Sequence, residues 1–336
     1  MLWQIWTLYH ALGYRVKPAK YILVQNPPSI PTLVICTWTA FFRCSRLVID
    51  WHNFGYSILA LKLGPSHLLV RVSKWYEGFF ARQASAHLAV TDAMVRVLKA
   101  DFGVEAKALH DRPATHFKPL SKDAKAQWLK GNASTKEFAQ DLEGGSFKLM
   151  VSSTSWTADE DFSILLDALC SYSTTVASRP GLPKILAIIT GKGPQKEHYL
   201  SQIRDLNQQN KLQNVVVSTC WLSVEDYSSI LGAADLGVSL HTSSSGVDLP
   251  MKVVDMFGAG LPVAAAKFDA LPELVKEGIN GRSFSTPKDL VDLLVELFSG
   301  NGTQLGKLKE GAMEESERRW DDEWVPIAGK LFQLNS

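Results

Sequence analysis

The sequence predicts an α/β protein of two domains, each built on a parallel, doubly wound sheet. Three observations lead to this class. The chain has 336 residues, which is long for one domain and suits two. Hydrophobic residues make up 46% of it, so a sizeable core can be buried. Short apolar runs alternate with helical stretches, and this alternation is typical of parallel βαβ units.

The alternation is most regular in the second half of the chain. The expected strands are residues 148–152, 184–190, 215–218, 236–240 and 261–265. The expected helices between them are residues 161–172, 196–209, 224–233 and 250–257. In such sheets, ligands bind beyond the carboxyl ends of the strands, near helix N-termini. The residues that directly follow each strand are therefore the first candidates for a functional site.

The first third of the chain alternates less regularly. Its expected strands are residues 21–25, 46–49 and 86–90, and its expected helices are residues 32–42, 68–84 and 93–102. Aromatic residues gather on one face of the helix at 68–84, and Thr91-Asp92 is expected to cap the next helix.

The apolar periodicity fades between residues 121 and 146, where Lys, Asn, Ser, Gln and Gly dominate. This stretch is interpreted as a variable surface segment and as the domain boundary. We therefore expect an N-terminal domain over residues 1–143 and a C-terminal domain over residues 144–336. The second domain is expected to end in helices at 305–319 and 326–334.

Composition argues against some classes of protein. The 35 Lys and Arg residues balance 34 Asp and Glu, which argues against a dedicated nucleic-acid-binding protein. The cysteines at 36, 44, 170 and 220 form no CxxC pair and have no zinc-ligand spacing. They are interpreted as reduced thiols in a cytosolic environment. No apolar run reaches the ~18–20 residues that span a bilayer.

The N-terminal stretch MLWQIWTLYHALGYRV is apolar and aromatic. No small-residue cleavage site follows it, so it is not expected to be a signal peptide. We predict an amphipathic core helix. Contact with a membrane surface stays an open alternative because of Trp3, Trp6 and Tyr9.

The clearest chemistry lies between His241 and Val263, in HTSSSGVDLPMKVVDMFGAGLPV. A polar loop comes first and contains His241, Ser243, Ser244, Ser245, Gly246 and Asp248. Pro250 suits the first turn of the helix that follows, and the unpaired N–H groups of a helix N-terminus favour phosphate. Lys252 adds a positive charge near that end, and Asp255 can accept hydrogen bonds from a ribose diol. Singly, each residue has an ordinary structural explanation, but together they predict a nucleotide-diphosphate site.

This segment resembles the sugar-nucleotide motif of GT-B glycosyltransferases, in which two Glu residues flank a Pro-containing helix start. Asp255 matches the second, ribose-binding Glu, whereas the first falls on Val247, one residue from Asp248. Four motifs closely resemble the chitobiosyldiphosphodolichol β-mannosyltransferase family: VIDWHNFGYSI, VSSTSWTADEDFSILLDAL, ITGKGP and SSSGVDLPMKVVDMFG. The resemblance runs from about residue 21 to 324 and is poor at 121–146. It implies a GT-B fold, in which two Rossmann-like domains face each other across a cleft, with the acceptor side N-terminal and the nucleotide-sugar donor side C-terminal.

The resemblance implies GDP-mannose as the donor and dolichyl-diphosphate-linked chitobiose as the acceptor, at the cytosolic face of the endoplasmic reticulum membrane. It implies an inverting transfer, which needs a base for the acceptor hydroxyl and stabilisation of the departing diphosphate. No cofactor is implied. No ligand spacing demands a metal, although a divalent ion is one way to compensate the phosphate charge.

Several residues are expected to hold the departing diphosphate, namely Lys252, the hydroxyls of Ser243 to Ser245, and backbone N–H groups near Gly246 and Pro250. Relatives carry an Arg and a Lys in the stretch that matches residues 155–161, where this chain has the acidic run Asp159-Glu160-Asp161. Lys252 is therefore expected to carry more of the charge compensation.

The sequence Thr190-Gly191-Lys192-Gly193-Pro194 follows a strand and opens a helix. Alone it is explained by a tight turn. Beside the donor motif, its glycines are expected to let the backbone approach the guanosine or the diphosphate closely.

Asp50 and His52 are the candidates for the catalytic base, because they follow the strand at 46–49 on the acceptor side. A turn cap for Asp50 and a core histidine for His52 are equally good explanations. His241 is expected near the diphosphate or the mannose.

Family members begin with a membrane anchor, a first strand and a Gly- and Arg-containing loop, and this sequence starts inside a later helix. The N-terminal domain is therefore expected to be incomplete, through an alternative start, a truncated isoform or a partial gene copy. We expect reduced or absent transfer with GDP binding partly kept.

The alternatives are a non-catalytic paralogue that associates with other mannosyltransferases of the pathway, and an enzyme with a UDP-sugar donor. A dehydrogenase is disfavoured, because no GxGxxG opens a helix after a strand.

Overall fold

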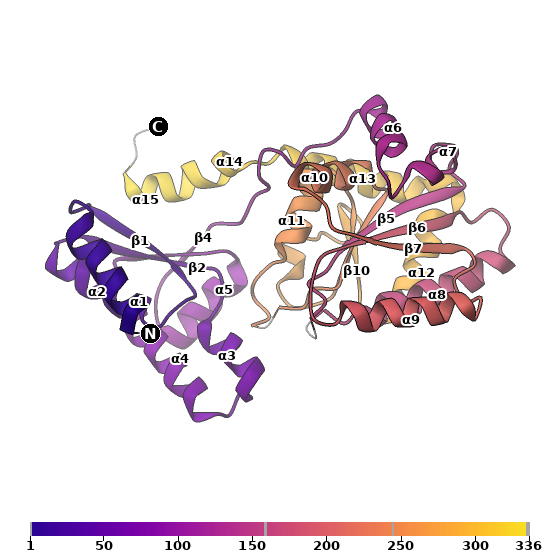
Figure 1. The fold of residues 1–336 in the computed structure, drawn as a ribbon. Coiled ribbons are helices and arrows are strands. Elements are labelled where there is room, and N and C mark those ends of the chain that lie inside the picture. Colours follow the sequence, from indigo (N-terminus) through magenta and orange to yellow (C-terminus); the bar gives the residue numbers. More distant parts are fainter. Residues whose placement is uncertain (1, 158–159, 244, 334–336) are drawn as a thin grey trace. The chain divides into compact units, whose positions relative to one another are not determined.

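The computed structural model describes residues 2–157, 160–243 and 245–333. The chain divides into two compact units (Figure 1). The first contains Met1–Asp111, Ser243–Leu249 and Asp321–Ser336, and the second contains Arg112–Thr242 and Pro250–Trp320. Both are built on parallel sheets, so the predicted fold class is confirmed.

The division lies elsewhere than the expected boundary at residue 143. The segment expected to be variable surface contains α6 (Lys122–Gly131), η3 (Lys136–Phe138) and α7 (Ala139–Gly144). Lys125 in α6 pairs with Asp235 of the second unit at 3.2 Å, which holds this segment there. The end of the chain returns to the first unit, where α14 (Trp320–Trp324), η6 (Val325–Gly329) and α15 (Lys330–Phe332) follow one another. Ala328 is fully buried there with Val48 and Leu88.

The first unit has a parallel sheet in the order β1-β2-β3-β4. Its strands are β1 (Tyr21–Asn26), β2 (Arg46–Trp51), β3 (Ala86–Ala89) and β4 (Lys107–Ala108). Its helices are α1 (Leu2–His10), η1 (Ala11–Arg15), α2 (Thr32–Phe42), α3 (Gly55–Leu63), α4 (Leu68–Ala81), α5 (Asp92–Val97) and η2 (Leu98–Phe102). The three predicted strands and Thr91 as helix cap are confirmed, since the Met94 N–H donates to Thr91 Oγ1 at 2.9 Å. α3 and β4 were not predicted.

The prediction of a core helix at the N-terminus is wrong. Among the described side chains of α1 and η1, none is buried. Trp3, Trp6 and Tyr9 are exposed because the helix rests on α2 through other contacts, including a hydrogen bond from Arg43 to the Leu12 carbonyl. Within the described ranges, no helix has the length and apolar character needed to cross a bilayer.

The second unit has a six-stranded parallel sheet in the order β10-β9-β8-β5-β6-β7. Its strands are β5 (Phe147–Ser153), β6 (Lys184–Thr190), β7 (Val215–Cys220), β8 (Leu236–Ser239), β9 (Val263–Ala266) and β10 (Gly281–Phe284). The remaining helices are α8 (Phe162–Ser178), α9 (Lys196–Gln208), α10 (Val224–Ala233), α11 (Met251–Gly258), α12 (Pro287–Phe298), η5 (Gly300–Gly302) and α13 (Thr303–Glu317). β5 lies between β6 and β8, so the winding reverses there, and the carboxyl ends of β5 and β8 form the switch point at which ligands bind in such sheets.

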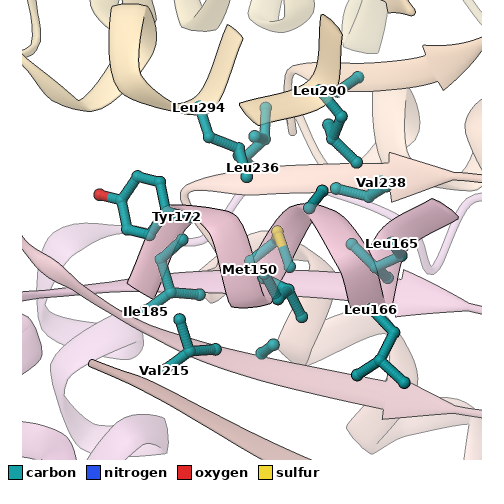
Figure 2. Close-up of a cluster of buried hydrophobic side chains, with 14 of the residues drawn as sticks. Met150, Leu165, Leu166, Tyr172, Ile185, Val215, Leu236, Val238, Leu290 and Leu294 are labelled. Atoms are coloured by element: carbon teal, nitrogen blue, oxygen red, sulfur yellow. The ribbon is translucent and has the colours of Figure 1, made fainter. Parts of the chain in front are cut away.

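The core of this unit lies between the sheet and the helices that cover it (Figure 2). Met150, Ile185 and Leu236 from three strands pack with Leu166 of α8 and Leu294 of α12. Tyr172 is also fully buried, and its hydroxyl donates to the Pro183 carbonyl at 2.9 Å. This packing fixes the strands whose carboxyl ends carry the site. β10 and α12 were not predicted.

Candidate functional site

A cavity of about 350 Å³ lies in the second unit, at the carboxyl ends of β5, β6 and β7. Its lining residues are Ser153, Thr154, Thr190, Gly191, Trp221, Leu222, Ser223, Val224, Tyr227, Lys252 and Asp255. The loops after three strands thus contribute to it, together with the first turns of α10 and α11. Lys252 and Asp255 of the predicted donor motif therefore lie at one cavity, and Gly191 joins them.

Asp255 lies in the middle of α11 and lines the cavity. Burial raises the pKa of its carboxyl to about 7. Tyr227 is close enough for the charge of Asp255 to act on it, and its hydroxyl lies 3.0 Å from Ser153 Oγ. A half-buried carboxylate beside hydroxyl groups is suited to accept hydrogen bonds from a diol.

Lys252 is paired. Its ammonium forms an ion pair with Glu160 and lies 3.2 Å from Ser155 Oγ. Glu160 is buried and also accepts hydrogen bonds from Thr154 Oγ1 at 2.7 Å and from the Ser155 N–H at 2.5 Å. The acidic run therefore supplies the counter-ion that holds Lys252 at the cavity. Lys252 was expected to compensate the charge of a diphosphate, and in this structure its charge is matched by Glu160.

The rest of the acidic run has no such role in the described residues. Asp159 lies outside them. Asp161 caps α8, because its Oδ1 accepts from the Ser163 N–H at 3.0 Å.

Gly191 and Gly193 are required by a neighbouring loop. A Cβ on Gly191, whose φ is +130°, would lie 1.8 Å from the Thr154 carbonyl oxygen. A Cβ on Gly193 would lie 1.7 Å from the Ser155 carbonyl oxygen. The glycines therefore let two protein loops meet. They were expected to make room for a nucleotide, but the geometric reason for them is the contact with the neighbouring loop. Trp156 follows with φ of +50° and is fully buried, which fixes this loop.

Lys192 projects over the Trp221 ring, with its ammonium 4.1 Å from the ring centroid. Trp221 directly follows β7, lines the cavity and is largely exposed. An aromatic face at the rim of a polar cavity can stack on a flat ring, and Lys192 covers that face here.

The loop Ser243–Leu249 belongs to the first compact unit. Its two described serine hydroxyls, of Ser243 and Ser245, donate to Asp248 Oδ1, the second at 3.0 Å. Gly246 has a φ of +75°, which favours glycine at this turn. The Val247 carbonyl accepts a hydrogen bond from Thr91 Oγ1 at 2.5 Å. Asp248 therefore organises this loop, and Ser244 lies outside the described residues.

His241 belongs to the second unit. Its ring meets Phe268 edge-to-face at 6.3 Å between centroids. It is not among the residues that line the 350 Å³ cavity.

Asp50 and His52 come together at the end of β2 in the first unit. Asp50 lies within the strand, which runs two residues further than predicted, and His52 directly follows it. His52 Nε2 lies 3.0 Å from Asp50 Oδ2. Burial lowers the pKa of His52, but the hydrogen bond and charge of Asp50, with the charge of Asp111, outweigh burial and raise it. The pair is a titrating imidazole held by a carboxylate, the arrangement of an oriented general base.

Three residues at the cavity were missed from the sequence: Glu160, Trp221 and Tyr227. Trp221 carried a signal, since it directly follows a strand, but the strand had been predicted to end at residue 218. Glu160 stood in a run that looked like a departure from relatives. Nothing in the local sequence marks Tyr227.

Comparison with known proteins agrees with this geometry. A family model described as "Glycosyl transferases group 1" matches residues 149–299, the segment that carries the cavity. Among solved structures, Anabaena Alr3699/HepE in complex with UDP is similar in fold, with a TM-score of 0.72, 18% identity and coverage of 98% of this chain and 81% of that one. TarM is similar with a TM-score of 0.67 and 15% identity, over 99% and 58%.

Sequence relatives are much closer than these structures. A chitobiosyldiphosphodolichol beta-mannosyltransferase of Arthroderma benhamiae is 53% identical over 99% of this chain and 76% of that protein. The Homo sapiens protein of the same name is 42% identical over 92% and 72%. UDP-glycosyltransferase TURAN of Arabidopsis thaliana is 43% identical over 96% and 78%. This chain belongs to the chitobiosyldiphosphodolichol beta-mannosyltransferase family of glycosyltransferases.

Proposed function

We propose that this chain transfers mannose from GDP-mannose to dolichyl-diphosphate-linked chitobiose, with inversion at the sugar carbon. The observation that carries this proposal is the cavity at the carboxyl ends of β5, β6 and β7, lined by Asp255 and by Lys252 with its buried counter-ion. The names of the relatives support the acceptor and the transferred sugar. Membership of the family supports a transferase rather than a binding protein.

Different parts of the donor are expected to contact different residues of the cavity. The Asp255 carboxylate accepts hydrogen bonds from the ribose hydroxyls, which needs its ionised form. The Lys252 ammonium shifts from Glu160 toward the diphosphate, where charge builds up as the sugar leaves. The Trp221 ring stacks on the guanine once Lys192 moves aside.

The acceptor hydroxyl is expected to lose its proton to His52. Asp50 holds the Nε2–H of the ring, so Nδ1 is the nitrogen that takes the proton. Asp50 is then a positioning residue that also stabilises the imidazolium. His52→Ala should lower kcat about 10²- to 10⁴-fold. Asp50→Asn should lower kcat less and shift the acid limb of the pH profile toward lower pH, because a source of the raised pKa is lost.

We place the reaction at the cytosolic face of the endoplasmic reticulum membrane. The described cysteines, Cys36, Cys44, Cys170 and Cys220, are all free thiols, which suits a reducing compartment. The polyisoprenoid of the acceptor keeps that substrate in a bilayer. We also propose that transfer needs no cofactor, and a chelator titration that abolished transfer would show a divalent-ion requirement instead.

The decisive experiment measures transfer and donor binding on the same preparation. Purified chain, GDP-mannose and a short-chain isoprenyl-diphosphate chitobiose in detergent should give a β-linked mannosyl product. Transfer should be lost in Lys252→Ala and Asp255→Ala and kept in Lys211→Ala, an exposed lysine away from the cavity. GDP binding without any transfer by the wild type would contradict the proposal and favour a non-catalytic partner of other mannosyltransferases.

A second candidate donor is a UDP-sugar, because one relative is named UDP-glycosyltransferase TURAN and the HepE structure holds UDP. Calorimetric titration with GDP and UDP separates the two donors. A base pocket that hydrogen-bonds one ring leaves polar groups unpaired with the other, so the preferred nucleotide should bind far more tightly.

A further inference from the structure

Helix α4 exposes an apolar stripe and buries polar side chains beside apolar ones. Its buried residues are Val70, Ser73, Glu77, Gly78, Phe80 and Ala81. Its outer face carries Leu68, Val72, Trp75 and Phe79, spaced four, three and four residues apart, so they form one stripe along the helix. The Trp75 side chain is 66% exposed.

Polar contacts hold the inner face of α4. Glu77 is fully buried and accepts hydrogen bonds from Ser29 Oγ and from the backbone N–H groups of Gly55 and Tyr56 at the start of α3. These contacts specify which face of α4 lies inward, so the outward direction of the apolar stripe is a built feature of the unit.

Helix α4 contacts α2, and α2 contacts α1, in the same unit (Figure 1). Exposed apolar side chains continue onto these two helices. A hollow of about 460 Å³ joins α4 to α2, lined by Trp38, Phe41, Phe42 and Phe79. A second hollow, of about 550 Å³, joins α2 to α1 and η1. Phe41 is 78% exposed and Trp3 is 74% exposed. We call Trp3, Trp6, Trp38, Phe41, Phe42, Leu68, Val72, Trp75 and Phe79 the aromatic face.

The segment that carries the aromatic face has a strongly positive net charge. Residues 1–85 contain nine Lys or Arg and only two Asp or Glu, a formal charge of +7, although the whole chain carries +1. The two acids are Asp50, which pairs with His52, and the buried Glu77. Arg71 and Arg82 are exposed and lie beside the α4 stripe at helical spacing.

We propose that the aromatic face docks on the surface of a phospholipid bilayer that contains anionic headgroups. Tryptophan favours the boundary between headgroups and acyl chains, and arginine and lysine around it favour anionic lipid. Because both acidic residues of the segment 1–85 are paired or buried, its exposed cations are left to meet an anionic surface. The inference deepens and rests on the proposed function, since a docked chain meets its lipid-linked acceptor at that surface.

The test is flotation of the full chain with vesicles that hold neither donor nor acceptor. Vesicles of phosphatidylcholine with about one fifth phosphatidylserine should bind the wild type, and pure phosphatidylcholine vesicles should bind it several-fold more weakly. Trp75→Ser with Phe79→Ser should lower the partition coefficient at least about tenfold, because two anchoring side chains are lost. Arg71→Glu with Arg82→Glu should abolish the preference for phosphatidylserine. Ile279→Ser removes a 55% exposed apolar residue from the second unit and should change nothing.

Equal flotation of the Trp75→Ser/Phe79→Ser variant and the wild type would overturn the docking proposal. If the wild type does not float but forms a dimer that the same substitutions dissociate, the face would be assigned to a second copy of the chain. If that variant does not fold, the arginine variant and the headgroup titration of the wild type decide. Transfer in detergent without vesicle binding would overturn docking alone, and vesicle binding without transfer would overturn the proposed function alone.

Discussion

Helices α12 and α4 belong to the two units, and they differ in what their outer faces carry. α12 buries Leu290, Leu293 and Leu294 and turns polar residues outward. α4 buries Ser73 and Glu77 beside Val70, Phe80 and Ala81, and it exposes Trp75 and Phe79. The apolar residues of α12 are therefore used in the core of the second unit, whereas α4 leaves large apolar side chains at the surface of the first unit.

The two units also differ in how they use a buried carboxylate. Burial raises the pKa of both Glu77 and Asp255 to about 7. Glu77 is occupied by hydrogen bonds that orient α4, while Asp255 faces a cavity. The buried carboxyl of the first unit is thus used in its architecture, whereas that of the second unit stays open to a cavity.

The largest expected effect tests the contrast between the helices. Leu294→Ala in α12 should lower the free energy of unfolding by about 2–5 kcal/mol, because it leaves a cavity in a packed core. Trp75→Ser in α4 should change the free energy of unfolding by no more than about 0.5 kcal/mol, because the side chain is largely exposed and makes few packing contacts. Urea denaturation monitored by circular dichroism measures both. A large loss in Trp75→Ser would show that the face is core after all.

Glu77 should give the first unit a distinctive dependence of stability on pH. The pKa of its carboxyl is about 7 in the folded chain and 4.5 in an unperturbed glutamate, so between these pH values the folded state holds a proton that the unfolded state has lost. This contribution to stability is complete below pH 4.5 and is lost as pH rises through 7, a change of roughly 3 kcal/mol. Glu77→Gln should remove that slope in chemical denaturation at a series of pH values. An unchanged slope would contradict the role of Glu77.

Substitutions in the Lys252–Glu160 pair should separate an effect on donor affinity from an effect on the stability of the second unit. Lys252→Ala should weaken GDP-mannose binding by roughly 1.5–3 kcal/mol, because a charge-assisted contact to phosphate is lost. It should also destabilise the second unit, since Glu160 keeps a buried charge without its ion-pair partner. Adding Glu160→Gln should restore stability but not donor affinity. Calorimetry and thermal melting measure the two effects, and recovery of both would place Lys252 outside the donor site.

The smallest expected effect is the dependence of donor affinity on pH. Asp255 is neutral below pH 7 in the free chain and must ionise to accept bonds from the ribose. Below pH 7 the affinity for GDP-mannose should rise by up to about tenfold for each pH unit, and then level off. Asp255→Asn should flatten this curve and weaken binding, whereas Glu77→Gln should leave its shape intact. A pH dependence that survives Asp255→Asn would assign it to another group.

The sequence was informative where local pattern determines structure. The apolar runs of β5, β6 and β8 predicted buried strands because a parallel strand covered on both faces is continuously apolar. The position of Asp255 after a Pro-initiated helix predicted its place at the cavity. These are features of a few consecutive residues.

Other features depend on residues far apart in the chain. The prediction that the aromatic residues of α4 share one face is wrong, because Trp75 and Phe79 are exposed whereas Phe80 is buried. The residues at 75 and 79 and those at 76 and 80 form adjacent stripes, and periodicity alone does not say which stripe meets the core. The Lys252–Glu160 pair joins positions 92 residues apart. The glycines at 191 and 193 were assigned to a nucleotide because the loop that they face, Thr154–Trp156, comes close only after folding.

The meeting of those two loops has a consequence for how the family can change its donor. Since a side chain at residue 191 or 193 would collide with backbone, neither glycine admits a single substitution without a shift of the neighbouring loop. The lining residues Trp221–Val224 follow β7 and carry side chains, so substitutions there can change the shape of the cavity. An engineer who wishes to alter nucleotide choice, or a chemist who wants an inhibitor selective between relatives, should therefore work on those four positions.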